Sequence, residues 1–146
     1  MTQAIQLDGP YLDIMYLRHE GYCCSQIIMK LVLRDLRQEN PELVRSMASL
    51  CYGGGHENGT CGILTAASCA LSLSLGGNSN RELPASDLSL LLDELVGWFT
   101  LQAQSSYGGI HCEEILSSSP DKRACSLLLI ATLEKLQAMR KTASPS

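Results

Sequence analysis

Apolar side chains recur at helical spacing along most of this 146-residue chain. In the segment 24–37, one helix face would carry Ile27, Ile28, Leu31, Val32 and Leu36. In the segment 86–107, the inner stripe would be Leu88, Leu91, Leu92, Leu95 and Phe99. Residues 61–75 are apolar almost all round, which predicts a central, buried helix. No segment alternates apolar and polar positions as a half-buried strand does, so the pattern predicts helices alone.

Glycine, proline and capping residues divide this pattern into elements. Three helices are predicted before the glycine-rich segment, over about 11–20, 24–37 and 41–50, the third beginning at Pro41. Thr60 is the predicted N-cap of the helix 61–75. A short helix is expected near His111 and a last one over 120–140, with residues 142–146 as a frayed tail. We therefore predict an all-α, single-domain bundle of five or six helices over residues 1–146.

Composition and charge exclude several classes of protein. The chain is 45% hydrophobic with a formal net charge of -4, and it has no cluster of Lys and Arg, so we expect it to fold and not to bind nucleic acid. The longest weakly polar run, residues 63–75, is too short to cross a membrane. The N-terminus lacks the pattern of a secretion signal. A cytoplasmic protein without a membrane partner is the resulting expectation.

Seven cysteines are many for such a protein, and their number is odd, which argues against a framework of structural disulfides. Four of them lie near predicted helix starts: Cys24, Cys61, Cys112 and Cys125. Cys61 also follows a glycine-rich loop, so unpaired N–H groups and the helix dipole are expected to lower its thiol pKa and make it a candidate nucleophile. Cys69 is expected to pack in the core. Cys51 is expected to be a neighbour of the site and not a ligand, while the role of Cys23 stays open.

The glycine-rich segment CYGGGHENGTCG, residues 51–62, contains the second group of candidate residues. Its glycines could aim backbone N–H groups at a sulfur or a cofactor, and the candidates for this role are Gly53, Gly54, Gly55 and Gly59. His56 in the same loop and His111 beside Cys112 are candidate ligands or bases, or residues of a solvated loop and a helix cap. The chain lacks the lysine of a phosphate-binding loop, a nucleophilic serine elbow and the second histidine of a zinc-protease motif.

Four stretches carry a resemblance to a known family: GYCCSQ at 21–26, GGGHENGTCG at 53–62, GGIHCEEIL at 108–116, and Cys125. Together they resemble the bacterial and archaeal family of redox-active proteins named for its C_GCAxxG_C_C cysteine pattern. The resemblance implies that Cys24, Cys61, Cys112 and Cys125 are the hallmark cysteines. It also implies an iron-sulfur site, because a similar domain in split-Soret cytochromes c looks like an iron-sulfur-binding module. The chain departs from the pattern at Ala66, where the family has glycine, and without CxxCH it is not expected to carry covalent haem.

Three hypotheses about function follow. In the first, the four hallmark cysteines hold an iron-sulfur cluster for electron transfer to an unknown redox partner protein, since four thiolates are the usual ligands of such clusters. In the second, Cys61 is the nucleophile of a thiol-disulfide pair. In the third, the protein is a non-redox interaction module or holds a structural zinc. A homodimer that shields an exposed cofactor at its interface is a candidate assembly.

Overall fold

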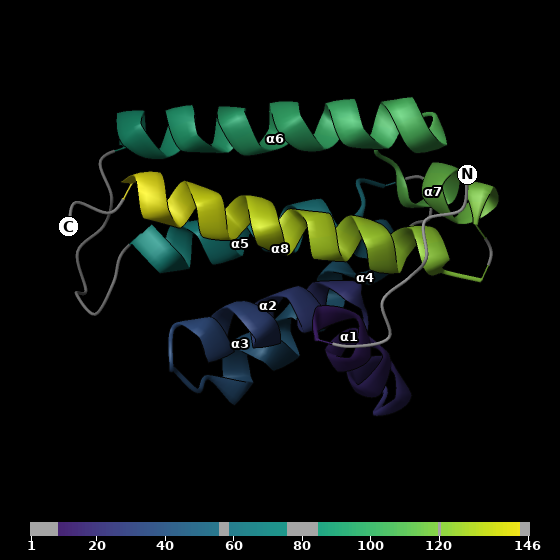
Figure 1. Cartoon of the computed structure of the whole chain (residues 1–146), viewed down its shortest axis with the longest axis horizontal. Helices are drawn as coiled ribbons and strands as arrows, with labels where there is room; N and C mark the ends of the chain where they lie inside the picture. Colours follow the sequence, from purple (N-terminus) through teal and green to yellow (C-terminus); the bar gives the residue numbers. More distant parts are fainter. Residues whose placement is uncertain (1–8, 56–58, 76–84, 120, 144–146) are drawn as a thin grey trace.

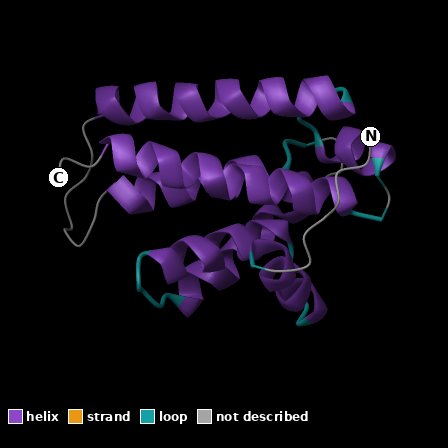
Figure 2. Ribbon diagram, viewed as in Figure 1, coloured by secondary structure: helices purple, strands orange, loops and turns teal. Residues whose placement is uncertain are grey.

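The computed structural model describes residues 9–55, 59–75, 85–119 and 121–143, and it is helical over nearly all of them (Figures 1 and 2). The elements are α1 (Pro10–His19), α2 (Cys24–Asp35), α3 (Pro41–Ser46), the 3₁₀ helix η1 (Met47–Leu50), α4 (Cys51–Gly54), α5 (Gly62–Leu75), α6 (Ala85–Tyr107), α7 (Cys112–Ser118) and α8 (Arg123–Ala143). Over the described residues, pairing of extended backbone is limited to one isolated bridge, between Thr60 and His111.

The all-α prediction is confirmed, but the predicted number of five or six helices is wrong. The described residues form seven regular α-helices, since α4 is a four-residue turn in which Tyr52 and Gly53 have left-handed backbone angles. The difference lies in short elements: α3 has six residues and α7 has seven, lengths at which an isolated helix is unstable in water. Local caps and packing support them, such as the Asn40 side chain, which accepts from the Leu43 N–H at the start of α3.

Helix α5 occupies the centre of the bundle. It packs most extensively against α2, then against α8, and also contacts α6. Three of its alanines, Ala66, Ala67 and Ala70, are fully buried, and small side chains let neighbouring helix axes approach closely. The predicted burial of this helix is therefore correct for the faces toward α2 and α8.

One face of α5 is nevertheless open, so the expectation that Cys69 packs in the core is wrong. Cys69 is exposed, and Thr65, Ser68 and Ser72, which share this face, are partly exposed. Ser68 and Ser72 each donate to the carbonyl four residues earlier, at 2.9 and 3.2 Å, which satisfies their hydroxyl groups within the helix. A stripe of Thr and Ser at helical spacing marks the face, and Cys69 lies within it.

The three central helices α2, α5 and α8 begin at the same end of the molecule, on the right in Figure 1. Helix α6 runs across the bundle in the opposite direction and therefore ends at that same end, where α7 follows it. As a result, the starts of four helices, α2, α5, α7 and α8, are gathered at one end of the bundle.

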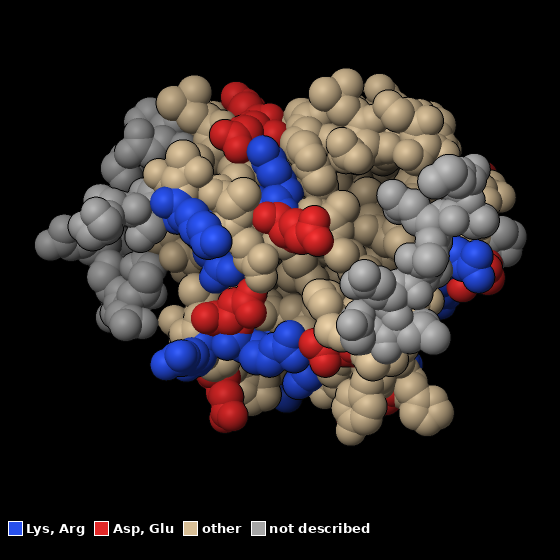
Figure 3. All heavy atoms as spheres, viewed as in Figure 1, with Lys and Arg blue, Asp and Glu red and all other residues tan. Residues whose placement is uncertain are grey.

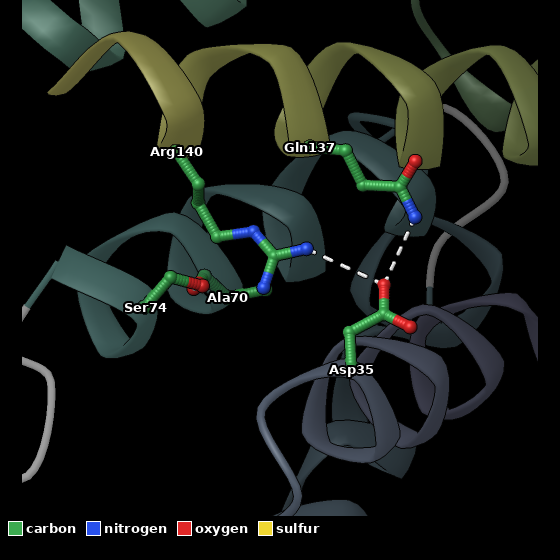
Figure 4. A network of polar contacts seen from close by, with 5 residues as sticks. All are labelled: Asp35, Ala70, Ser74, Gln137 and Arg140. Atoms are coloured by element: carbon green, nitrogen blue, oxygen red, sulfur yellow. Dashed lines mark hydrogen bonds and ion pairs between the residues drawn. The ribbon is translucent and has the colours of Figure 1, made fainter. Parts of the chain in front are cut away.

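Polar contacts join α2 and α8 at the opposite end (Figure 4). Asp35, at the end of α2, accepts from the Gln137 side-chain amide at 3.0 Å and from the Arg140 guanidinium at 3.3 Å. The Asp35 and Arg140 side chains keep 30% and 19% of their exposure, so solvent screens the pair and its contribution is of order 1 kcal/mol. These contacts help to hold α2 and α8 in register, and thereby their starts.

The charged residues are unevenly distributed over the surface. On the face drawn in Figure 3, positive and negative side chains are interspersed on the left and below, whereas none lies over the C-terminal half of α6. The sequence explains this, since no charged residue occurs between Glu94 and Glu113. None of the described helices is both long and apolar enough to cross a membrane.

Candidate cysteine site

The four cysteines at predicted helix starts line one cavity of about 480 Å³. Cys24 is the first residue of α2, Cys61 immediately precedes α5, Cys112 is the first residue of α7, and Cys125 is the third residue of α8. Cys61 and Cys125 are buried, with 5% and 6% of their surface exposed, and Cys24 and Cys112 are half-buried. Residues up to 101 positions apart in sequence thus line the same cavity because four helices begin there.

A short backbone connection sets Cys61 beside Cys112. The Cys61 N–H donates to the Ile110 carbonyl at 2.8 Å, and the Cys112 N–H donates to the Gly59 carbonyl at 2.9 Å. These two bonds flank the antiparallel bridge between Thr60 and His111. Two cysteine-bearing loops are therefore fixed to each other before their helices begin.

Cys61 itself occupies the N-cap position of α5, so the prediction that Thr60 caps this helix is wrong by one residue. The Cys61 carbonyl accepts from the Thr65 N–H at 3.3 Å, the first hydrogen bond of the helix. Its sulfur accepts from the N–H groups of Ile63 and Leu64, which lowers the thiol pKa, but burial outweighs them and raises that pKa to about 12. The predicted low pKa of Cys61 is therefore wrong.

The lowered pKa belongs to Cys24 instead. The Cys125 thiol donates a hydrogen bond to the Cys24 sulfur, and with the nearby Arg18 guanidinium this lowers the pKa of Cys24 to about 6 against the opposing effect of burial. Arg18 also donates to the Cys24 sulfur at 3.7 Å. Conversely, donation to Cys24 together with burial raises the pKa of Cys125 well above its usual range. These opposite pKa shifts favour Cys24 as the thiolate and Cys125 as the thiol of the pair.

Two positively charged residues complete the walls of the cavity. Besides its bond to Cys24, Arg18 has a buried Nε for which the described residues offer no hydrogen-bond partner. Lys122 donates from Nζ to the Tyr52 hydroxyl at 3.1 Å and lies 5.3 Å from the centre of its ring. Both Lys122 and Tyr52 have positive φ angles, 65° and 55°, which residues with a Cβ adopt only at a cost in free energy. Nothing in the sequence pattern singled out these three residues.

The cavity wall contains two further cysteines, Cys23 and Cys51. Their sulfur atoms lie within disulfide-bonding distance, and their Cα atoms are 6.1 Å apart, in the usual range for a disulfide. The sequence placed Cys51 near the site, and the structure agrees. The pairing with Cys23 was not predicted, because the two residues are 28 positions apart.

The four glycines predicted to contact a cofactor lie outside the wall of the cavity. The wall of the cavity includes Gly62 but none of Gly53, Gly54, Gly55 and Gly59. A Cβ on Gly53 would lie 2.7 Å from the Gly59 carbonyl oxygen, so this glycine lets the two ends of the loop meet. The loop thereby positions Gly59, which accepts from the Cys112 N–H. That these glycines donate to a cofactor stays a prediction.

Of the two candidate histidines, the structure describes His111, and His111 does not line the cavity. His111 is exposed and precedes α7 as its N-cap residue, and its N–H donates to the Glu114 side chain at 3.2 Å. His56 lies outside the described residues, as do Pro120 and the tail residues 144–146. Over the part of the chain that is described, no three or more His, Cys, Asp or Glu side chains are arranged around a point where a metal ion would bind.

Comparison with known proteins supports the resemblance seen in the sequence. No curated protein and no solved structure matches the chain. A family model described as "Putative redox-active protein (C_GCAxxG_C_C)" matches residues 22–139, a range that includes all four hallmark cysteines and both residues of the Cys23–Cys51 pair. The chain therefore belongs to the C_GCAxxG_C_C family of redox-active proteins.

Proposed function

We propose that the cavity holds an iron-sulfur cluster, with Cys24, Cys61, Cys112 and Cys125 as its ligands, and that the protein transfers electrons. The observation that carries the proposal is the meeting of these four thiols, from the starts of four helices, in one cavity of about 480 Å³. Four cysteine thiolates are the usual ligand set of [2Fe-2S] and [4Fe-4S] clusters.

The electrostatics of the cavity support a negatively charged occupant. The starts of α2, α5 and α8 direct the positive ends of their dipoles toward it, and Arg18 and Lys122 add two positive charges. The buried Arg18 Nε, without an acceptor among the described residues, fits a sulfur atom of such a group.

In this proposal the protein's own residues set the properties of the site. A bound cluster would supply one-electron redox chemistry. Cys61 and Cys125 are buried and Cys24 and Cys112 are half-buried, so a cluster held by these four thiols would be partly shielded from water. Arg18 would donate hydrogen bonds to sulfur and thereby stabilise the more negative, reduced form.

The test is anaerobic purification or reconstitution with iron and sulfide, followed by a visible spectrum and analysis of iron and acid-labile sulfide. Cys61→Ser and Cys112→Ser should each abolish or strongly reduce the bound iron. Cys69→Ser is the matched control, since Cys69 is exposed on α5 away from the cavity, and it should retain the full iron content. A chain that stays colourless and iron-free, or that keeps its iron in both ligand variants, overturns the proposal.

A second function, thiol-disulfide exchange, is favoured by the ionisation of Cys24. Its thiolate would attack a substrate disulfide and release one substrate thiolate, leaving a mixed disulfide on Cys24. Cys125, once deprotonated, would then attack the Cys24 sulfur, release the second substrate thiolate and form a Cys24–Cys125 disulfide. An iron-free protein that reduces a small disulfide, and loses this activity in Cys24→Ser, would identify this function instead.

A further inference from the structure

We propose that Cys23 and Cys51 form a second redox site, a reversible disulfide in the wall of the cavity that exchanges two electrons with small thiol and disulfide compounds. The pair uses none of the four hallmark cysteines. Its chemistry therefore requires no occupant of the cavity.

The pair joins two segments of the chain that line the cavity. Cys23 is the N-cap residue of α2, directly before Cys24, and Cys51 begins the α4 turn that follows η1. Their Cα atoms are already 6.1 Å apart, so the disulfide needs no rearrangement of the backbone. Both residues are half-buried and face the cavity, which leaves them within reach of a small reagent.

A buried serine, Ser25, can accept hydrogen bonds from the two cysteines when they are reduced to thiols. The Ser25 hydroxyl donates its single proton to the Met47 carbonyl at 2.7 Å, so toward sulfur its oxygen is an acceptor. That oxygen lies 3.0 Å from the Cys51 sulfur and 3.3 Å from the Cys23 sulfur. A reduced thiol can donate to it, whereas a disulfide has no proton to give. The site can therefore hold the thiols without leaving a buried polar group unpaired.

The exchange balances with a small disulfide of the glutathione class as oxidant. One thiol of the pair, as thiolate, attacks the small disulfide and releases one small thiolate, which takes up the proton. The second thiolate attacks the protein sulfur of the mixed disulfide, forms the Cys23–Cys51 bond and releases the second small thiol. Two protein thiols are oxidised and one small disulfide is reduced to two thiols, and the reverse sequence reopens the pair.

Closing the pair fixes the position of the segment that carries Cys61 relative to Cys24. Cys51 is ten residues before Cys61, and a Cβ on Gly62 would lie 2.6 Å from the Leu50 carbonyl oxygen, so the start of α5 is packed directly on this segment. Cys23 is the residue next to Cys24. Closing the pair therefore adds a covalent restraint next to Cys24 and, through the packed segment, near Cys61.

The experiment equilibrates the full chain, treated with a chelator, in buffers of oxidised and reduced glutathione of varied ratio. Remaining thiols are trapped with a maleimide and the peptides are mapped by mass spectrometry. A Cys23–Cys51 linked peptide should appear as the ratio rises and disappear on return to the reduced buffer, with a loss of two alkylation sites per chain. Cys23→Ser and Cys51→Ser should each lose this species, while the Cys69→Ser control keeps it.

Absence of the linked peptide at every ratio, or linkage of Cys23 to Cys24 or of Cys24 to Cys125 in its place, overturns the proposal. Circular dichroism of the serine variants excludes loss of the fold as the cause. The outcome is separate from that of the iron analysis. The pair can be oxidised and reduced in a chain that binds no iron, and iron can bind in a chain whose pair does not form a disulfide.

Discussion

The lowered pKa of Cys24 predicts an unusual dependence of its reactivity on pH. With a pKa of about 6 in place of its ordinary 9.0, the thiol is mostly ionised at neutral pH. At pH 7 the thiolate fraction of Cys24 is then about 90%, against about 1% for an ordinary cysteine. This fraction matters because the thiolate is the reactive form. A less basic thiolate is also a weaker nucleophile, by roughly 20-fold over this difference in pKa, so the net gain at pH 7 is only about fourfold.

The shape of the profile is therefore more informative than the rate at one pH. We expect the alkylation rate of Cys24 to rise to a plateau just above its pKa of about 6, whereas an ordinary thiol continues to gain reactivity up to its pKa of 9.0. The assay is pulse alkylation with iodoacetamide in chelator-treated, reduced protein, with the Cys24 peptide quantified by mass spectrometry. A Cys23→Ser background leaves one cysteine in that peptide and keeps a residue suited to the N-cap.

Two variants test the causes of the shift separately. Cys125→Ala removes the thiol that donates to Cys24, the largest cause, and should move the inflection well toward 9. Arg18→Met removes a positive charge while keeping an extended apolar stem, and should move it less. A rate that still climbs through pH 9 in the parent protein, or an inflection unaffected by Cys125→Ala, would refute the assignment of the thiolate to Cys24.

Two further predictions concern stability and are measured by urea unfolding. Gly62→Ala should lower the free energy of unfolding by about 1–3 kcal/mol, because its Cβ would lie 2.6 Å from the Leu50 carbonyl oxygen. Gly97 lies in the exposed middle of α6, where an added Cβ would meet nothing within 4 Å, so Gly97→Ala should raise the free energy of unfolding by about 1 kcal/mol. Equal effects of the two glycine substitutions would contradict this reasoning. Cys51→Ser should lower the free energy of unfolding by about 3–4 kcal/mol under oxidising conditions, because the disulfide closes a loop between residues 28 positions apart and so lowers the entropy of the unfolded chain. Adding a reductant should lower the free energy of unfolding of the parent protein by a similar amount. Equal stability of the parent with and without reductant would exclude a closed Cys23–Cys51 pair.

Local signals in the chain predict the helices well and their ends less well. Pro41 begins α3 as expected, and the predicted segments 24–37 and 61–75 correspond to α2 and α5. The predicted N-cap of α5 is wrong by one residue: Thr60 is paired with His111, and the Thr65 N–H donates to the carbonyl of Cys61. That bridge joins segments about fifty residues apart, so no local pattern reports it.

The chemistry of the thiols shows the same division between sequence and tertiary structure. The sequence by itself determined an all-helical chain and the position of four cysteines at helix starts, since helical periodicity, prolines and glycines act over a few residues. Only the tertiary structure decided that these starts meet in one cavity, that Cys69 faces solvent, and that Cys23 lies against Cys51. It also decided which thiol ionises. A helix start favours a thiolate at Cys61, but burial outweighs this local effect and raises the pKa of that thiol. At Cys24 the Cys125 thiol and Arg18 lower the pKa instead, and both burial and these partners depend on which side chains the packed helices bring together.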